Sequence, residues 1–162
     1  MQTIGFGGGC HWCTEAIFQS LKGVLKVQQG WIASDGEAAE FSEAVVMDFD
    51  HEIISIATLV AVHLHTHSST SDHSMRNKYR SAVYAVSDVQ AVELQGVIER
   101  MQPQFEQPII TKVHALRKFK INKEEFQNYY NNDPEKPFCR TYISPKLRLI
   151  MKLFSKEVKA DV

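Results

Sequence analysis

The 162-residue sequence has no run of the roughly 18 apolar residues that a membrane-spanning helix needs. Its longest apolar-rich stretch, residues 53–64, is interrupted by Ser55, Thr58 and His63. The opening residues MQTIGFGGGC have neither a basic segment nor a long apolar core, so they do not resemble a secretory signal peptide. We therefore expect a cytoplasmic protein that does not associate with membranes.

Cysteine is also scarce, with three residues in all. A small, odd number of cysteines argues against a disulfide scaffold and favours free, catalytic or metal-bound thiols in a reducing compartment. The sequence also lacks a large excess of either charge, because it has 18 Lys and Arg residues and 19 Asp and Glu residues, for a formal net charge of -1. This balance argues against nucleic acid as a partner, since nucleic-acid-binding domains carry a strongly basic face.

Glycine is nearly absent after the first quarter of the chain, because seven of the eight glycines lie within residues 5–36. The tight turns therefore gather near the N-terminus. Apolar periodicity predicts, in order, a strand, a helix, two strands, a helix and a strand. Their ranges are residues 3–6, 10–21, 24–32, 42–50, 53–65 and 81–86.

This order is the split βαβ plan of ferredoxin-like folds. We expect one catalytic domain over residues 1–162, an α/β two-layer sandwich with a mixed sheet. Residues 131–162 should form an extended C-terminal segment that wraps this core and carries Cys139. The elements expected after the core are a helix over 88–101, a strand over 109–116, a helix over 123–130, a proline-bounded loop over 134–145 and a terminal helix over 147–158.

Residues 7–15, GGGCHWCTE, form the most specific local pattern. A glycine turn leaves a strand, and a helix begins at Cys10. Backbone N–H groups at a helix start carry partial positive charge and stabilise a thiolate, so the position predicts a reactive thiol at Cys10. A C-x-x-C pair with Cys13 at a helix start is also typical of thioredoxin-like proteins, which leaves a disulfide oxidoreductase as an alternative.

With Trp12 between the cysteines, this pattern resembles the fingerprint of the A-type peptide methionine sulfoxide reductases, G-C-F-W-C with a glutamate two residues on. The resemblance continues in the correct order along nearly the whole chain. Residues 42–46, SEAVV, match the family motif H-A-E-x-V, and residues 78–84, KYRSAVY, match Q-Y-R-S-A-I-Y. The other similar segments are residues 16–24, 30–31, 108–113, 137–139 and 144–147.

The resemblance implies an oxidoreductase that reduces the S epimer of methionine sulfoxide, free or in proteins, to methionine. It implies that Cys10 is the nucleophile, that Glu43 is a proton donor held protonated in an apolar site, and that Tyr79 stabilises the leaving oxygen. The matching substrate-binding positions are Gly9, His11, Trp12 and Ser74. Trp12 would cradle the S-methyl group of the substrate.

The resemblance also implies how the enzyme is regenerated. Cys10 is left as a sulfenic acid, a second thiol condenses with it, and thioredoxin or another dithiol reduces the resulting disulfide. We expect Cys139 to be the resolving cysteine, because a proline-bounded segment should be mobile enough to reach Cys10, and Cys13 is the alternative. No cofactor and no metal is implied, and we expect a monomer.

Three departures from the family pattern stand out. His11 replaces a phenylalanine, and it could bind the substrate or favour the Cys10 thiolate. Residues 31–43 are shorter than usual and lack a second active-site tyrosine. Ser74 stands where the family has aspartate, with Asp72 close by. These changes motivate a second alternative, a non-catalytic relative that binds methionine segments.

Four histidines lie close together in the sequence, at His63, His65, His67 and His73. Imidazole is a common zinc ligand, but neither cysteine nor an acidic pair flanks this group at ligand spacing. Histidine near a helix C-terminus is favoured by the helix dipole without any metal. We therefore expect one or two of these side chains to line the mouth of the site.

Overall fold

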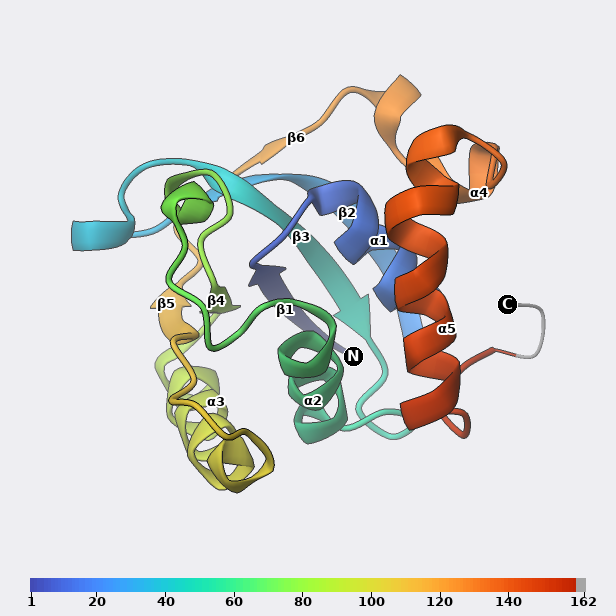
Figure 1. The fold of residues 1–162 in the computed structure, drawn as a ribbon. Helices are drawn as coiled ribbons and strands as arrows, with labels where there is room; N and C mark the ends of the chain where they lie inside the picture. The colour runs from blue at the N-terminus through green and yellow to red at the C-terminus, as the bar shows by residue number, and fades with distance from the viewer. Residues whose placement is uncertain (160–162) are drawn as a thin grey trace.

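The computed structural model describes residues 1–159, apart from the side chains of Ser74 and Asn77. Its centre is a six-stranded mixed sheet with the strand order β5-β4-β1-β3-β2-β6 (Figure 1). The strands are β1 (Gln2–Gly7), β2 (Val24–Ala33), β3 (Ser42–Phe49), β4 (Ala82–Ala85), β5 (Lys112–Ala115) and β6 (Lys118–Ile121). The helices are α1 (His11–Gln19), α2 (Ile56–Thr66), α3 (Asp88–Met101), α4 (Tyr129–Asn132) and α5 (Ser144–Leu153).

The four inner strands, β4-β1-β3-β2, pair antiparallel throughout. With α1 between β1 and β2, and α2 between β3 and β4, they make the split βαβ plan that the sequence predicts. At the two edges, β5 adds parallel to β4 and β6 adds antiparallel to β2, which makes the sheet mixed. The expected fold class is confirmed.

The main core lies between one face of the sheet and the helices α1, α2, α3 and α5. Alternate residues of β1, Ile4 and Phe6, point into this layer, as the two-residue period of a strand requires. The Phe6 ring stacks on Phe18 of α1, with centroids 4.7 Å apart. Among the described residues, the other face of the sheet carries a small buried cluster around Tyr84. A two-layer arrangement follows, and it leaves the β1–α1 turn at one end of the core.

Two expected helix starts are displaced for local reasons. Residues 53–65 were expected to be helical, but α2 begins at Ile56, where the Ser55 hydroxyl accepts the Thr58 backbone N–H as a cap. The helix expected from Cys10 begins at His11, with Cys10 itself at the N-cap. The expected strand over 109–116 is shorter, because only residues 112–115 pair with β4.

The prediction of a helix over residues 123–130 is wrong. The structure has a single 3₁₀ turn, Glu124–Phe126, and the four-residue helix α4, separated by Asn128 in the left-handed conformation at φ 57°. The backbone N–H groups of Asn128 and Tyr129 donate to the buried Glu15 carboxylate instead of to a helix. Tertiary contacts thus divide this segment. The neighbouring strand β6 was not predicted.

The expected loop over residues 134–145 is mostly helical. A π-helical turn, Cys139–Ile143, runs directly into α5, with Pro145 in the first turn of that helix, where proline is tolerated. The terminal helix ends at Leu153, five residues before the predicted end. α5 packs against α1, so this segment lies beside the start of α1 (Figure 1). Within residues 1–159, no helix has the length and apolar character required to cross a bilayer.

Candidate active site

Cys10 lies where β1 turns into α1. The turn depends on Gly8, whose φ of 151° is rarely adopted by other residues, and whose absent side chain leaves room for the His67 ring. A Cβ atom on Gly8 would lie 2.5 Å from His67 Cδ2. Cys10 holds the N-cap of α1 and is half-buried. The sequence prediction for this residue's position is therefore confirmed.

The thiol of Cys13 is the main partner of Cys10. A hydrogen bond from Cys13 is the largest cause of a lowered pKa at Cys10, and the backbone N–H groups of Trp12 and Cys13 lower it further. Burial and the nearby Glu43 carboxylate oppose this shift. The same contact, together with burial, raises the pKa of Cys13. Cys13 is therefore a protonated donor that stabilises a thiolate on Cys10.

Glu43 is buried on β3, next to the backbone of the first helical turn. Its Oε1 accepts the His11 backbone N–H at 3.2 Å and lies 3.5 Å from His11 Nδ1. Its Oε2 lies 3.5 Å from Lys78 Nζ on the solvent side. The carboxyl group thus joins the start of α1 to the segment that carries Tyr79, although 32 or more residues separate these groups along the chain.

His11 is buried behind Glu43 instead of facing the cavity. Its Nδ1 lies 3.1 Å from the Gly30 carbonyl oxygen, and its ring meets the edge of Trp31 at 5.2 Å between centroids. Gly30 permits close approach of β6, because a Cβ atom there would lie 2.1 Å from the Lys120 carbonyl oxygen. His11 is not among the residues that line the cavity, and its Nδ1 faces Gly30 and Glu43, so the expected contact of His11 with the substrate stays a prediction.

Trp12 is covered by the C-terminal part of the chain. The Tyr129 ring stacks on it at 4.2 Å with an interplanar angle of 6°, and Phe138 meets it edge-on at 5.5 Å. Lys136 Nζ lies 4.1 Å from the centroid of the Tyr129 ring. The Trp12 indole nitrogen is buried without a hydrogen-bond partner among the described residues. Tyr129 carries no local signal in the sequence, because it stacks on a residue far away along the chain.

Tyr79 follows the 3₁₀ turn Ser74–Asn77 and is half-buried. The neighbouring Arg76 holds this segment in place, because its guanidinium group donates hydrogen bonds to four backbone carbonyl oxygens. The accepting carbonyls belong to Gly8, Ser68, Ser71 and Tyr79. Arg76 therefore ties the Tyr79 segment to the glycine turn before Cys10. The side chain of Ser74 lies outside the described part of the structure.

A cavity of about 750 Å³ opens beside Cys10. The residues that line it include Cys10, Cys13 and Tyr79, together with Phe138, Tyr142, Lys146 and Leu149 from the C-terminal part of the chain. Gly9 also faces the cavity, where Lys146 Nζ would lie 3.9 Å from a Cβ atom at that position. The largely apolar walls suit a thioether side chain, and the Lys146 ammonium group faces the same cavity as Cys10.

The histidines are used in hydrogen bonds and in the cavity wall. His63 Nε2 lies 2.7 Å from the Gly7 carbonyl oxygen, and His67 bridges the His63 carbonyl and the Ser81 hydroxyl. Burial lowers the pKa of His67 to about 4, so its imidazole is neutral near pH 7. His65, His67 and His73 line the cavity. In the described part of the chain, no three His, Cys, Asp or Glu side chains converge as metal ligands.

Cys139 is fully buried in the π-helical turn, within the hydrophobic cluster that also holds Cys13 and contacts Cys10. Burial raises the pKa of its thiol. The segment was expected to be an open loop, but its backbone is helical because it runs directly into α5. All three cysteines are free thiols in the structure.

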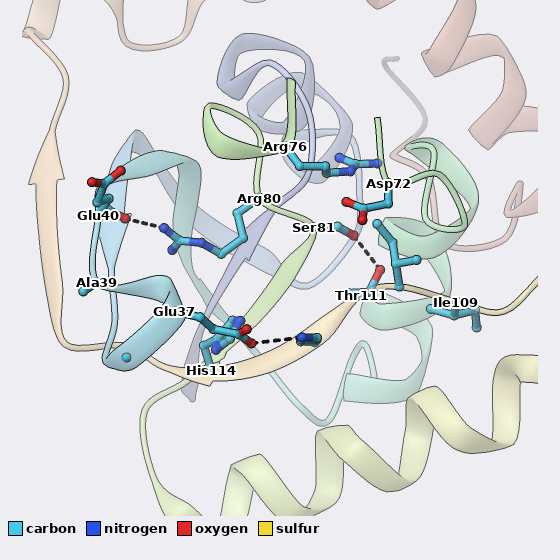
Figure 2. A pocket seen from close by; sticks show the side chains of 13 residues that line it. Glu37, Ala39, Glu40, Asp72, Arg76, Arg80, Ser81, Ile109, Thr111 and His114 are labelled. Atoms are coloured by element: carbon cyan, nitrogen blue, oxygen red, sulfur yellow. Dashed lines mark hydrogen bonds and ion pairs between the residues drawn. The ribbon is translucent and has the colours of Figure 1, made fainter. Parts of the chain in front are cut away.

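A second pocket of about 730 Å³ lies at the β4–β5 edge, where the 36–40 loop approaches the sheet (Figure 2). Arg80 donates to the Glu40 backbone carbonyl and Lys112 pairs with Glu37, so three of its charged side chains are held by partners within the pocket. The Ser81 and Thr111 hydroxyls meet at 2.7 Å on its inner wall. The residues that line this pocket include no cysteine, so the reactive thiol belongs to the first cavity.

Comparison with known proteins agrees with the motifs. A family model described as "Peptide methionine sulfoxide reductase" matches residues 2–158. "Peptide methionine sulfoxide reductase MsrA" of a Nitratiruptor species is 33% identical over 164 residues, covering 93% of this chain and 94% of the relative.

Two solved structures of Mxr1 from Saccharomyces cerevisiae share the fold. The reduced form has a TM-score of 0.74 at 21% identity, covering 87% of this chain and 90% of that chain. The complex of Mxr1 with Trx2 has a TM-score of 0.62 at 21% identity, covering 79% of this chain and 84% of that chain. Taken with the cysteine site and the match over nearly the full length, these findings establish that the chain belongs to the peptide methionine sulfoxide reductase family.

Proposed function

We propose that this protein reduces the S epimer of methionine sulfoxide, free or in proteins, to methionine. The observation that carries the proposal is the Cys10 thiol, which holds the N-cap of α1, has a pKa lowered by the neighbouring Cys13 thiol and faces a largely apolar cavity. A low-pKa, accessible thiolate is the nucleophile that sulfoxide reduction requires. Family membership supports the same reaction.

The reaction begins when the Cys10 thiolate attacks the sulfoxide sulfur. A sulfur–sulfur bond forms while Glu43 supplies a proton to the oxygen, and the Tyr79 hydroxyl stabilises the charge that develops there. The hydroxyl group then passes to the Cys10 sulfur as the sulfur–sulfur bond and the substrate's sulfur–oxygen bond break, which releases methionine and leaves Cys10 as a sulfenic acid. The substrate sulfur gains the two electrons that the Cys10 sulfur loses.

For regeneration, we propose that Cys139 attacks the sulfenic acid, releasing water and forming a disulfide that thioredoxin reduces. The cluster that holds Cys13 and Cys139, with Cys10 packed against it, supports this order. The solved complex of Mxr1 with Trx2, which has the same fold, supports thioredoxin as the donor. Three free thiols suit a reducing, cytoplasmic compartment, and we propose that the protein acts there as a monomer.

The direct test is reduction of each separated epimer of a methyl sulfoxide, with dithiothreitol as the electron donor. We expect turnover of the S epimer only. Cys10→Ser should abolish this turnover, and retained turnover in that variant would contradict the proposed mechanism. Binding of methionine sulfoxide without turnover by the unmodified protein would favour a non-catalytic methionine-segment binder.

The contact between Cys13 and Cys10 also supports a second candidate function, thioredoxin-like disulfide exchange. This function predicts reduction of insulin disulfides and a Cys10–Cys13 disulfide after oxidation, and it requires no contribution from Glu43. Insulin reduction that is unchanged in Glu43→Gln, without sulfoxide turnover in the unmodified protein, would favour it.

A further inference from the structure

The residue at position 78 departs from the family motif, and its side chain lies beside Glu43 and Tyr79, the two residues proposed to act on the sulfoxide oxygen. The motif has glutamine before the tyrosine, whereas this chain has Lys78 before Tyr79. Lys78 Nζ lies 3.5 Å from Glu43 Oε2 and 5.1 Å from the centroid of the Tyr79 ring. One ammonium group therefore stands beside both of the groups that would act on the sulfoxide oxygen.

Lys78 differs from Glu43 in its access to solvent. The lysine side chain is 58% exposed, whereas that of Glu43 is 8% exposed. His11 contacts Oε1 of the same carboxyl group from the buried side, so Lys78 is the partner of that group on the solvent side. Both the Tyr79 hydroxyl and Glu43 raise the pKa of Lys78, so its side chain carries a proton near neutral pH.

We propose that Lys78 is a further catalytic residue, whose ammonium group donates a hydrogen bond to the sulfoxide oxygen between Glu43 and Tyr79. This inference rests on the proposed function. The sulfoxide oxygen carries partial negative charge, which grows as its bond to sulfur breaks, and a fixed donor at that point stabilises the transition state more than the ground state. Lys78 keeps its proton, so the overall reaction remains thiol plus sulfoxide giving sulfenic acid plus thioether.

A simpler role for Lys78 is compensation of the Glu43 charge. The two roles differ in their effect on Cys10, because an uncompensated Glu43 carboxylate raises the pKa of the Cys10 thiol. Loss of charge compensation would therefore slow every reaction of the thiolate. Loss of an oxygen-binding donor would slow only reactions of substrates that carry the oxygen.

The experiment compares Lys78→Gln, which restores the family residue, with Lys78→Arg. Lys26→Gln is the matched control, since Lys26 is exposed on β2 and its substitution makes the same change in net charge. The rate of a single turnover at a saturating concentration of the S epimer measures the chemical step. The rate of alkylation by iodoacetamide measures the reactivity of the Cys10 thiolate in the absence of any sulfoxide. Thermal unfolding confirms that each variant is folded.

For Lys78→Gln we expect the chemical step to slow roughly tenfold, less than the roughly hundredfold or greater loss typical of a buried oxyanion donor, because Lys78 is solvent-exposed. Alkylation should change less than about twofold, and Lys78→Arg and Lys26→Gln should stay within about threefold of the unmodified protein. A full rate in Lys78→Gln, or an equal fall in alkylation, would overturn the inference. If the unmodified protein reduces neither epimer, the proposed function itself has failed, which is a distinct result.

Discussion

The ring of Tyr129 lies flat on the indole of Trp12, with centroids 4.2 Å apart and planes within 6°. The Lys136 ammonium also lies over the Tyr129 ring, at 4.1 Å from its centroid. Trp12 is the residue expected to cradle the substrate methyl group, so one face of its indole is already occupied by the chain itself. The 126–138 segment therefore forms part of the site, although it is remote from Trp12 in sequence.

This stack leads to a prediction for stability. Tyr129→Ala should lower the free energy of unfolding by about 1–3 kcal/mol, because it removes an aromatic pair and opens a gap above Trp12. Tyr129→Phe keeps the stacked ring and should stay within about 0.5 kcal/mol of the unmodified protein. Urea unfolding followed by tryptophan fluorescence measures both values. Equal stability of Tyr129→Ala and the unmodified protein would show that the stack does not hold this segment.

Cys13 should control the reactivity of Cys10. Cys13→Ala removes the hydrogen bond that is the largest cause of the lowered Cys10 pKa, so that pKa should rise. The pH dependence of alkylation by iodoacetamide should shift upward, and the rate near pH 7 should fall several-fold, since the thiolate is the reacting form. Cys139→Ala is the control and should leave the Cys10 titration unchanged. An unshifted Cys10 titration in Cys13→Ala would show that the N-terminus of α1 stabilises the thiolate without help from Cys13.

His67 should make the fold sensitive to mild acid. Burial lowers its folded-state pKa from 6.5 to about 4, so the unfolded chain binds a proton more readily than the folded chain between these values. Its contribution to stability is complete above about pH 6.5 and is lost as the pH falls toward 4, up to about 3 kcal/mol.

Measurement of the free energy of unfolding between about pH 4.5 and 7.5 is the check. His67→Gln should flatten this pH dependence, while His65→Gln, which changes a histidine with an exposed hydrogen bond to Gln104, should not. An unchanged slope in His67→Gln would assign the acid sensitivity to His63, whose pKa is also lowered by burial.

Cys139 should be needed for regeneration and not for the first turnover. With thioredoxin as donor, Cys139→Ala should reduce one equivalent of the S epimer and then stop, because no thiol converts the sulfenic acid to an exchangeable disulfide. Rapid-quench kinetics separates the single turnover from steady-state turnover. Full steady-state turnover in Cys139→Ala would instead mean that Cys13 is the resolving cysteine or that thioredoxin reduces the sulfenic acid directly.

Local sequence signals were sufficient for the central part of the fold. The first six elements were predicted in the correct order, because strand alternation, helical periodicity and glycine turns act over a few residues. The same is true of Cys10, whose place at the N-cap of α1 follows from the adjacent glycines. Prediction failed at β6 and at residues 123–130, where pairing with β2 and the buried Glu15 carboxylate determine the backbone.

The split βαβ core, the family and the position of the reactive thiol could therefore be read from the amino-acid order, since each depends on contiguous residues. Four relationships needed the folded chain: His11 sits behind Glu43, Tyr129 covers Trp12, Cys139 is buried, and Lys78 reaches the carboxyl group. Most of these relationships join residues from separate elements. Their geometry is set by how the edge strand and the C-terminal helices pack on the core, which no local pattern encodes.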